Sequence, residues 1–359
     1  MKIRKKHTLA AATLCAALPA MAQTGDSLTL YGIIDTAVRT QTGLTAGYAR
    51  SPLNSTVVNS GVGPTSRWGL RGSEDLGGGL RATFNLEGGI NVDTGAQANA
   101  TTMFDRASIV GLAGNWGGIT VGRQNTLIAD SAGVTDPIGL RFASLNPNIQ
   151  NVSLTGHQLG VEYGATGSTA SSNRVNNSAK YSLPVGNFVA RAMISMGEVA
   201  GSSTKQRTAG LGADYITPAL TVTTAYTRYK DANDRDLTAA NAGVSWLALP
   251  SLRLMANYGY NSGMTSATAE STNRVKVIGL NYAITPAIDL LAGYYKVDRH
   301  RTAQADDGFK RLLAFVEYKF SKRSKVYLEL DNTKWKGDYL GAGNKSTSTG
   351  LSLGITHTF

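Results

Sequence analysis

Single arginine and lysine side chains are the feature of this sequence with the clearest chemical meaning. They recur on segments in which every second residue is apolar, and many of them take the polar positions of that alternation. Fixed positive charges along a wall attract anions and repel cations without any bond being made or broken. We therefore expect them to line a water-filled cavity. The basic residues that alternation places on the polar side are Arg39, Arg67, Arg81, Arg174, Lys180, Arg191 and Arg253.

Two acidic residues, Asp130 and Asp136, lie on the longest stretch without a clear strand pattern, at about 125–172. If they face the arginines, a field crosses the cavity, and an anion preference remains because the basic residues outnumber the acids. Asp136 precedes Pro137, so turn formation is its alternative role. The stretch "HQLGVEYGA" at 157–165 alternates like a strand, and it is either a short hairpin arm or a further strand.

Enzymatic chemistry has little support in the sequence. The histidines beyond residue 22 are His157, His300 and His357, and neither His157 nor His300 has a nearby Ser-Asp arrangement. The single cysteine, Cys15, precedes residue 23, and no two histidines are closely spaced as metal ligands would be. The stretch "GLGADY" at 210–215 lacks the third glycine and the helix of a dinucleotide-binding turn. We predict no catalytic residue, no cofactor and no metal.

The first 22 residues have the pattern of a secretory signal peptide. A basic start is followed by an apolar stretch at 9–18 and by Ala20-Met21-Ala22, a small-x-small cleavage signature. A transmembrane anchor, the alternative, needs about 18 continuous apolar residues. We expect cleavage after Ala22, which leaves 23–359 as a single domain.

The rest of the chain is moderately basic. Four of the 35 Lys and Arg residues lie in 1–22, which leaves 31 against 24 acidic residues and a formal charge of +7. A basic protein can bind nucleic acid, but the only dense basic run is "SKRSK" at 321–325, and no nucleic-acid-binding motif is present. No nucleic-acid partner is predicted.

Segments of about ten alternating residues, closed by Gly, Pro, Asn or Asp turns, repeat from residue 27 onward. No long helical periodicity competes with them. Tight turns alternate with long polar links, so one end of the sheet has short turns and the other has loops. The sixteen predicted strands are 27–39, 66–76, 79–90, 104–113, 118–124, 173–184, 186–198, 205–217, 219–230, 237–248, 251–261, 272–284, 287–299, 309–320, 324–336 and 347–359.

Two all-β architectures fit such a pattern, a soluble sandwich and a transmembrane barrel. The non-apolar face carries charged residues on nearly every strand, which is too many for the outside of a sandwich around a single core. In a transmembrane barrel the apolar face meets lipid and the polar face lines water, and closure leaves no unpaired strand edge. The mean hydropathy of −0.13 is no objection, because only every second residue must be apolar. We predict a sixteen-stranded antiparallel transmembrane β-barrel.

Several stretches resemble the Gram-negative general porin family, in the branch whose mature chains open on a strand of the "SLTLYGIID" type. They are "SLTLYGIIDTAV" at 27–38, "SRWGLRGSEDLGGGLRATFNLEGG" at 66–89, "VGLAGNWGGITVGRQ" at 110–124, "NRVNNSAKYSLP" at 173–184, "YKFSKRSKVY" at 318–327 and "LSLGITHTF" at the end.

The resemblance implies a homotrimer in the outer membrane whose third long loop, about 125–172, folds inward as a constriction. It implies that the outer-membrane barrel-assembly machinery reads Phe359, and that lipid and lipopolysaccharide surround the barrel. Arg67, Arg106 and Arg123 match positions where the family, and its anion-selective members in particular, place basic residues near the narrowest point. Alternation is ambiguous for Arg106 and Arg123, so a β-bulge near Gly111 or Gly122 is expected.

The resemblance implies a porin for passive diffusion of small hydrophilic solutes and ions, with a preference for anions. A substrate-specific channel for a nutrient anion, such as a carboxylate or phosphate, is the alternative, and saturable conductance would distinguish it. An outer-membrane enzyme is a third class, for which the sequence offers no residues. For each single basic residue, contact with lipopolysaccharide or solvent near the loops is the alternative to a place in the wall.

Overall fold

The protein is represented by a computed structural model that describes residues 26–152 and 173–359. Within this part of the chain, the strands form one antiparallel sheet. Its elements are β1 (Ser27–Leu44), β2 (Arg50–Ser60), β3 (Arg67–Gly77), β4 (Leu80–Gly89), β5 (Ala107–Gly114), β6 (Gly117–Asn125), α1 (Leu127–Thr135), α2 (Pro147–Val152), β7 (Arg174–Val185), β8 (Phe188–Ser195), β9 (Thr208–Ile216), β10 (Leu220–Lys230), β11 (Asp236–Leu249), β12 (Leu252–Met264), β13 (Glu270–Thr285), β14 (Ile288–Arg301), β15 (Asp307–Lys319), β16 (Ser324–Lys336), the 3₁₀ turn η2 (Gly337–Tyr339) and β17 (Thr347–Thr358).

The sheet closes on itself through its first and last strands. β1 pairs with β17 from Ile33 opposite Thr358 to Gln41 opposite Gly350. Two backbone hydrogen bonds extend this seam: Gly32 N donates to Phe359 O at 3.2 Å, and Phe359 N donates to Gly32 O at 3.1 Å. Because β1 pairs along its other edge with β2 and β3, a complete ring of strands results. The fold is therefore a β-barrel, as predicted.

Two of the strands share one position in the wall. β2 and β3 pair with the same edge of β1, β2 along Thr36–Leu44 and β3 along Ser27–Ile33. The six residues between them, 61–66, interrupt this wall strand, so the described strands make a sixteen-stranded barrel. The sixteen predicted strands cover all sixteen wall positions, but they leave out 50–60, and the prediction is wrong there because β2 is a strand. Pro52 and polar residues at successive positions hide the alternation there.

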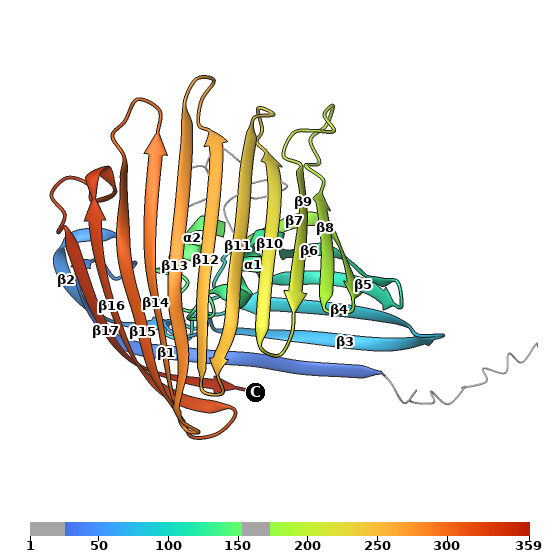
Figure 1. The fold of residues 1–359 in the computed structure, drawn as a ribbon, viewed down its shortest axis with the longest axis horizontal. Helices are drawn as coiled ribbons and strands as arrows, with labels where there is room; N and C mark the ends of the chain where they lie inside the picture. The colour runs from blue at the N-terminus through green and yellow to red at the C-terminus, as the bar shows by residue number, and fades with distance from the viewer. Residues whose placement is uncertain (1–25, 153–172) are drawn as a thin grey trace, which may run out of the picture.

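The two faces of the barrel differ as the alternation requires. On β17, Leu351, Leu353 and Ile355 are 44%, 64% and 51% exposed, whereas Ser352 and Thr356 are buried. The strands of opposite walls cross steeply: β10–β13 stand nearly upright and β3 lies nearly horizontal (Figure 1). Such crossing follows from the tilt of barrel strands, which is about 35–45° to the axis. An apolar outer face and a polar inner face suit a membrane-spanning barrel.

A helical segment lies on the concave side of the sheet, behind β10–β13 in Figure 1. α1 begins at the N-cap Thr126, whose hydroxyl accepts a hydrogen bond from Ala129 N at 3.1 Å, and ends before Asp136. In the described part of the chain, no helix is long and apolar enough to cross a membrane.

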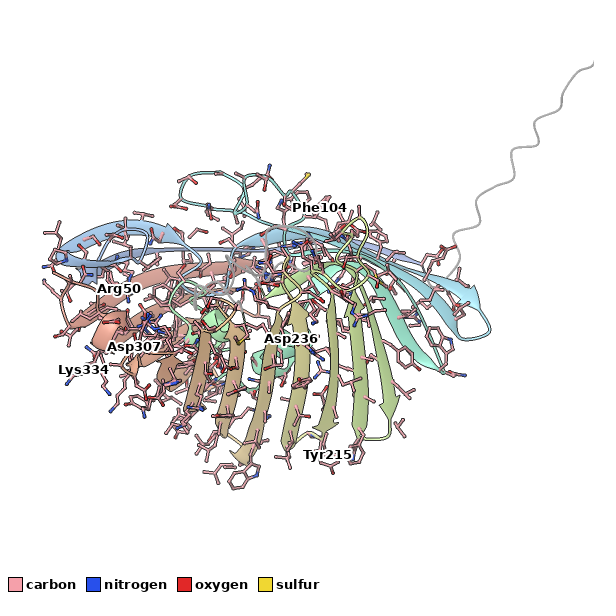
Figure 2. The ribbon with its side chains drawn as sticks, turned by 90° about the horizontal axis from the view of Figure 1, so that it is seen from above. Arg50, Phe104, Tyr215, Asp236, Asp307 and Lys334 are labelled. Carbon is pink, nitrogen blue, oxygen red and sulfur yellow. The ribbon has the colours of Figure 1, made fainter. Side chains whose placement is uncertain are left out.

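Seen from above, the helices of this segment lie inside the ring of strands (Figure 2), and packing holds the segment to the wall at two places. Leu127, Ile128 and Ala132 of α1 are buried in one cluster with wall residues that include Met193 and Tyr229. Ile138, Phe142 and Leu145, which follow α1, are buried in a second cluster with residues of β13–β16. The described part of the predicted 125–172 loop thus lies against the inner wall from β7 round to β16, whereas 153–172, including the alternating stretch at 157–165, is outside the described residues.

Candidate functional site

A charged cavity of about 570 Å³ lies on the inner side of β3–β7. Four basic side chains line it, from β3, from the segment before β5, and from β7. The two acids on the same surface are Glu87 of β4 and Asp130 of α1. The cavity lining therefore carries two more positive than negative charges. The basic residues are Arg67, Arg106, Arg174 and Lys180.

Glu87 holds two of these arginines in place. Its carboxylate lies 2.6 Å from Arg106 Nε and 3.4 Å from Arg67 Nε. The hydroxyl of Tyr31 donates to the same carboxylate at 2.9 Å and to Asn85 Oδ1 at 2.8 Å. Since one carboxylate is shared by two guanidinium groups, part of their charge stays uncompensated and faces the cavity.

Arg123 and Arg174 are fixed next to this pair by backbone carbonyls. Arg123 Nε donates to Asp105 O at 2.6 Å, and Arg174 Nε donates to Arg106 O at 2.7 Å. The β6–β7 register shifts between Gly122 and Gln124, and Gly122 has φ +127°, a conformation that favours glycine. The predicted bulge is present at Gly122.

The acid Asp130 joins α1 to the opposite edge of the cavity. Its carboxylate lies 2.6 Å from Lys180 Nζ and 3.6 Å from an Arg191 guanidinium nitrogen. Arg191 is bound more closely by Asp214, at 2.6 Å. Asp130 therefore faces basic residues of the wall, although the ion pairs it makes are with β7 and β8 and not with Arg67, Arg106 or Arg123.

Asp136 organises the turn after α1. Its carboxylate accepts hydrogen bonds from Ile138 N at 3.0 Å, Leu140 N at 2.9 Å, Asn148 Nδ2 at 2.8 Å and the Tyr295 hydroxyl at 3.0 Å. Burial raises the pKa of Asp136, and the hydrogen bonds from Leu140, Asn148, Asn146 and Tyr295 oppose that rise. With 2% of its surface exposed, this residue matches the turn role and does not line the charged cavity.

The remaining predicted wall residues lie elsewhere. Arg39 is fully buried, 2.9 Å from Glu329 and 2.5 Å from Asp331. Arg81 is exposed near the Gly77–Gly79 turn, and Arg253 donates to Ser245 Oγ at 3.1 Å. None of the three lines the charged cavity. Alternation assigned them a face of the sheet, but it carries no information on the height along the barrel or on what covers the residue.

Several charged residues of the inner wall were not singled out as site residues from the sequence. Glu87 is the most important, and its position on the polar side of its strand was the available signal. The segment from α1 to α2, 127–152, is called the inward segment below. On the far wall Glu317 pairs with Arg141 of this segment and, at 2.9 Å, with Lys325. Arg311 donates to Leu145 O of the same segment. The contacts of Arg141 and Leu145 hold the inward segment to β15.

The arrangement is suited to ion passage and offers no catalytic constellation. Fixed cations held by shared acids can attract anions from water, and none of the cavity residues is a histidine or cysteine. Among the described residues, no group of three or more His, Cys, Asp or Glu side chains is placed to hold a metal.

A closed barrel with an apolar outside and a charged, polar inside defines a transmembrane β-barrel channel. The chain belongs to the Gram-negative porin family, whose model matches residues 8–338. It is 27% identical over 400 residues to an outer membrane porin protein of Bordetella pertussis, covering 99% of this chain and 100% of that one.

Solved structures share the fold. An anion-selective porin from Comamonas acidovorans superposes with a TM-score of 0.75 at 23% identity, over 93% of this chain and 100% of that one. OmpT of Vibrio cholerae, in a trimer form, gives a TM-score of 0.66 at 16% identity, over 93% and 99%. With the family match, the protein is an outer-membrane channel for passive diffusion and not an enzyme.

Proposed function

We propose that this porin passes small hydrophilic solutes and ions with a preference for anions. The observation that carries the proposal is the excess of basic side chains on the charged cavity, where Arg67 and Arg106 share a single carboxylate, Glu87. A narrow space bounded by protein focuses the field of such charges and raises the local anion concentration. The similar fold of an anion-selective porin is consistent with this.

The inward segment supplies the narrowing in this proposal. α1 occupies space on the concave side of the wall and carries Asp130 to within 2.6 Å of Lys180. The region between Asp130 and the pair Arg67 and Arg106 is then the selective part of the channel. Arg123 lies beside it, bound to Asp105 O. The segment 125–172 as a whole is the proposed constriction loop.

The test is the reversal potential of the purified protein in a planar bilayer across a tenfold KCl gradient. We expect an anion-selective wild type, and we expect Arg67→Gln/Arg106→Gln to lose most of that preference, because two of the four cavity cations are removed. Arg123→Gln should give a smaller change, since Arg123 is bound to Asp105 O beside the cavity.

A matched control removes the same charge away from the cavity. Arg228 is 54% exposed and Lys322 lies on an exposed short turn, so Arg228→Gln/Lys322→Gln should leave the potential unchanged. A cation-selective wild type, or a cavity variant that behaves like the control, contradicts the proposal. Conductance that saturates with one carboxylate or phosphate would instead identify a substrate-specific channel.

Assembly and export complete the proposed function. The chain is secreted with cleavage after Ala22, a position outside the described residues, and 23–359 forms one barrel domain. Phe359 acts as the signal for the barrel-assembly machinery, and its exposed ring covers Gly32 at the seam. The barrel forms a homotrimer surrounded by lipid and lipopolysaccharide, as the trimer form of a similar barrel suggests.

A further inference from the structure

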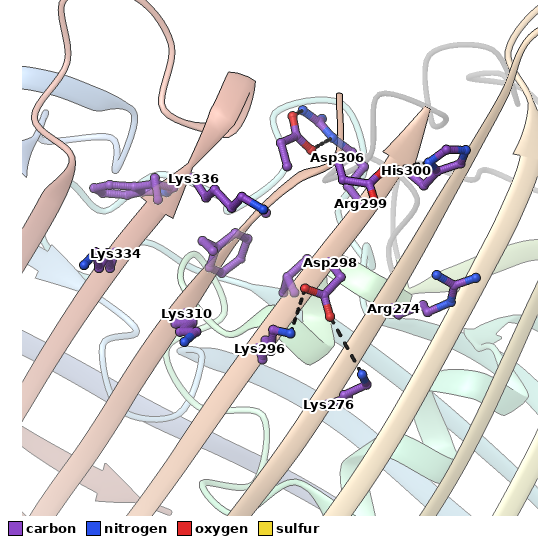
Figure 3. Close-up of a pocket in the computed structure, with 15 residues that line it drawn as sticks. Arg274, Lys276, Lys296, Asp298, Arg299, His300, Asp306, Lys310, Lys334 and Lys336 are labelled. Carbon is purple, nitrogen blue, oxygen red and sulfur yellow. Dashed lines mark hydrogen bonds and ion pairs between the residues drawn. The ribbon is translucent and has the colours of Figure 1, made fainter. Parts of the chain in front are cut away.

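Four lysines stand side by side on the outer face of β13–β16 (Figure 3). Lys276 is directly opposite Lys296, Lys296 is opposite Lys310, and Lys310 is opposite Lys334. Neighbouring strands lie about 4.8 Å apart, so the four ammonium groups form a continuous row. Like charges directly opposite one another destabilise a sheet. A bound anion would therefore offset the repulsion within this lysine row.

The row lies at the border of the apolar band. On three of the strands the next outward residue toward the short-turn end is apolar and exposed: Ile278 at 63%, Tyr294 at 42% and Leu312 at 37%. On β13, the distance from Lys276 to Ile284 is about 20 Å along the barrel axis, for a rise of about 3.4 Å per residue and a tilt of about 40°. This is close to the height of about 25 Å of the apolar band of an outer-membrane barrel.

Acidic residues compensate only one half of the row. Asp298 lies 3.1 Å from Lys296 and 3.8 Å from Lys276. Among the described residues, no carboxylate lies within 4.0 Å of Lys310 or Lys334, whereas Lys276 and Lys296 both pair with Asp298. The hollow beside the row, about 510 Å³, is lined further by Arg274 and Lys336. Asp306 and Asp307 also line it, but Asp306 pairs with His300, and Asp307 pairs with Arg299 and Arg301. The β15–β16 half of this surface therefore carries the uncompensated positive charge.

The position of the lysine row along the barrel indicates which leaflet of the membrane it contacts. In outer-membrane barrels the short turns face the periplasm and the longer links face outward. The turn joining β15 to β16 is short, and the lysine row lies at the opposite ends of these strands. The row is thus at the level of lipid headgroups in the outward-facing leaflet.

We propose that the lysine row binds the phosphate groups of an anionic glycolipid of the outer leaflet. The inference rests on the proposed lipopolysaccharide partnership and names the residues that would make it. A phosphorylated glycolipid brings negative phosphates and acyl chains in one molecule, and here cations and an exposed apolar wall are adjacent in the same order. Lys310 and Lys334 are the principal ligands, because no acid competes for them.

The test compares binding of three probes to the purified full-length protein in detergent. These are lipopolysaccharide, the same lipid with its phosphates removed, and inorganic phosphate. For the phosphorylated lipid we expect Lys310→Gln/Lys334→Gln to weaken binding about 25-fold, at about fivefold for each lysine. The dephosphorylated lipid should bind wild type and variant equally weakly.

Two control variants separate charge position from folding. Lys322→Gln/Arg323→Gln removes the same charge from the short turn at the other rim and should bind like wild type. Lys310→Arg/Lys334→Arg keeps the charge and should bind within about threefold of wild type. Unchanged binding by the Gln variant, or equal binding of both lipids, would overturn the inference. Competition by inorganic phosphate at equal concentration would show a site for free phosphate instead.

The reversal potential distinguishes a failure of this inference from a failure of the proposed anion selectivity. The lysine row lies outside the barrel, so its Gln variant should keep the reversal potential of wild type, which also shows that the barrel has folded. A channel without anion preference that still binds the phosphorylated lipid would contradict the proposed function alone. A selective channel whose Gln variant still binds the lipid would contradict the lysine row alone.

Discussion

Two clusters of basic residues on the inner side of the barrel, around Arg67 and around Arg39, occupy equivalent faces of their strands but differ in surroundings. Arg67 and Arg106 share one carboxylate and border a cavity of about 570 Å³. Arg39 has two carboxylates to itself, Glu329 and Asp331, and has no exposed surface. The comparison indicates why Arg67, and not Arg39, is proposed to act on passing ions: around Arg67 acids are fewer and water reaches the side chain.

Phe142 of the inward segment is the physical origin of the difference. Its ring lies 4.8 Å from the guanidinium carbon of Arg39, and the ring of Tyr48 lies 5.7 Å away on the loop after β1. Together they exclude water from Arg39 and provide cation–π contacts. Beside Arg67 the described residues leave a cavity. An arginine is therefore structural at position 39, whereas the arginine at position 67 is proposed to select ions.

Removing Arg39 should give the largest effect on stability. Arg39→Met leaves Glu329 and Asp331 buried without their cation, which should cost about 3–5 kcal/mol of the free energy of unfolding. Arg67→Gln should cost less than about 1 kcal/mol, since Arg67 is partly exposed. Denaturant unfolding in detergent, monitored by tryptophan fluorescence, measures both.

The triple variant Arg39→Met/Glu329→Gln/Asp331→Asn is the control for that comparison. It removes the two uncompensated charges and should recover much of the lost stability. Equal losses in Arg39→Met and Arg67→Gln would mean that the two clusters do not differ in the way described.

The turn at Asp136 should give an intermediate effect that depends on pH. Burial raises the pKa of Asp136, so the folded protein disfavours its ionised form. As the pH rises from about 3.9, the ordinary value in an unfolded chain, through the raised pKa of the folded state, wild type loses stability and Asp136→Asn does not. The Tm of wild type minus that of Asp136→Asn should fall as the pH is raised above about 4.

Asp136→Ala serves as the reference in the same measurement. It removes the Asp136 oxygens that accept from Leu140 N, Asn148 and the Tyr295 hydroxyl, and should cost about 1–3 kcal/mol near pH 4. The cost should shrink as the pH rises, because Asp136→Ala also lacks the carboxyl that titrates in wild type. A Tm difference for Asp136→Asn that is constant or rises with pH would mean that the carboxylate is ionised in the folded protein throughout this range.

Changing Glu87 should give the smallest effect in free energy, and it tests the charged cavity most directly. Glu87→Gln frees Arg67 and Arg106 from their shared acid and should raise the chloride-to-potassium permeability ratio about twofold to threefold, for a change of about half a kT per unit charge in local potential, which acts on the two ions in opposite directions. Glu74→Gln, an exposed acid near a short turn, is the matched control. A fall in the ratio for Glu87→Gln would place the selective region elsewhere.

Alternation was sufficient to predict the barrel because each wall strand has one face in apolar surroundings and one in polar surroundings. It failed for β2, whose residues include Pro52 and polar side chains at successive positions. It also gave no sign of α1, since nine residues are too few for a clear helical period and much of α1 is buried.

The partners of the basic site residues were harder to predict from the sequence than the strands. Arg39 meets Glu329 and Asp331, which lie 290 and 292 residues away in sequence, and only the seam between β1 and β17 brings β16 near it. The alternation of Arg106 and Arg123 predicts a bulge near Gly111 or Gly122, and the structure has a register shift at Gly122, so this local signal is informative. Which arginines share an acid depends on three-dimensional pairing that the alternation does not encode.

The seam between β1 and β17 also bears on how the barrel is made. Apart from the pairings of β1 with β3 and with β17, the paired strands in the described residues are consecutive in sequence, so most wall contacts close short loops at low entropic cost. The β1–β17 contact joins residues more than 300 positions apart, such as Ile33 and Thr358. The chain can therefore form a curved open sheet first, and this sheet remains open until β17 pairs with β1. Closure of the ring then requires every strand between them to be in place.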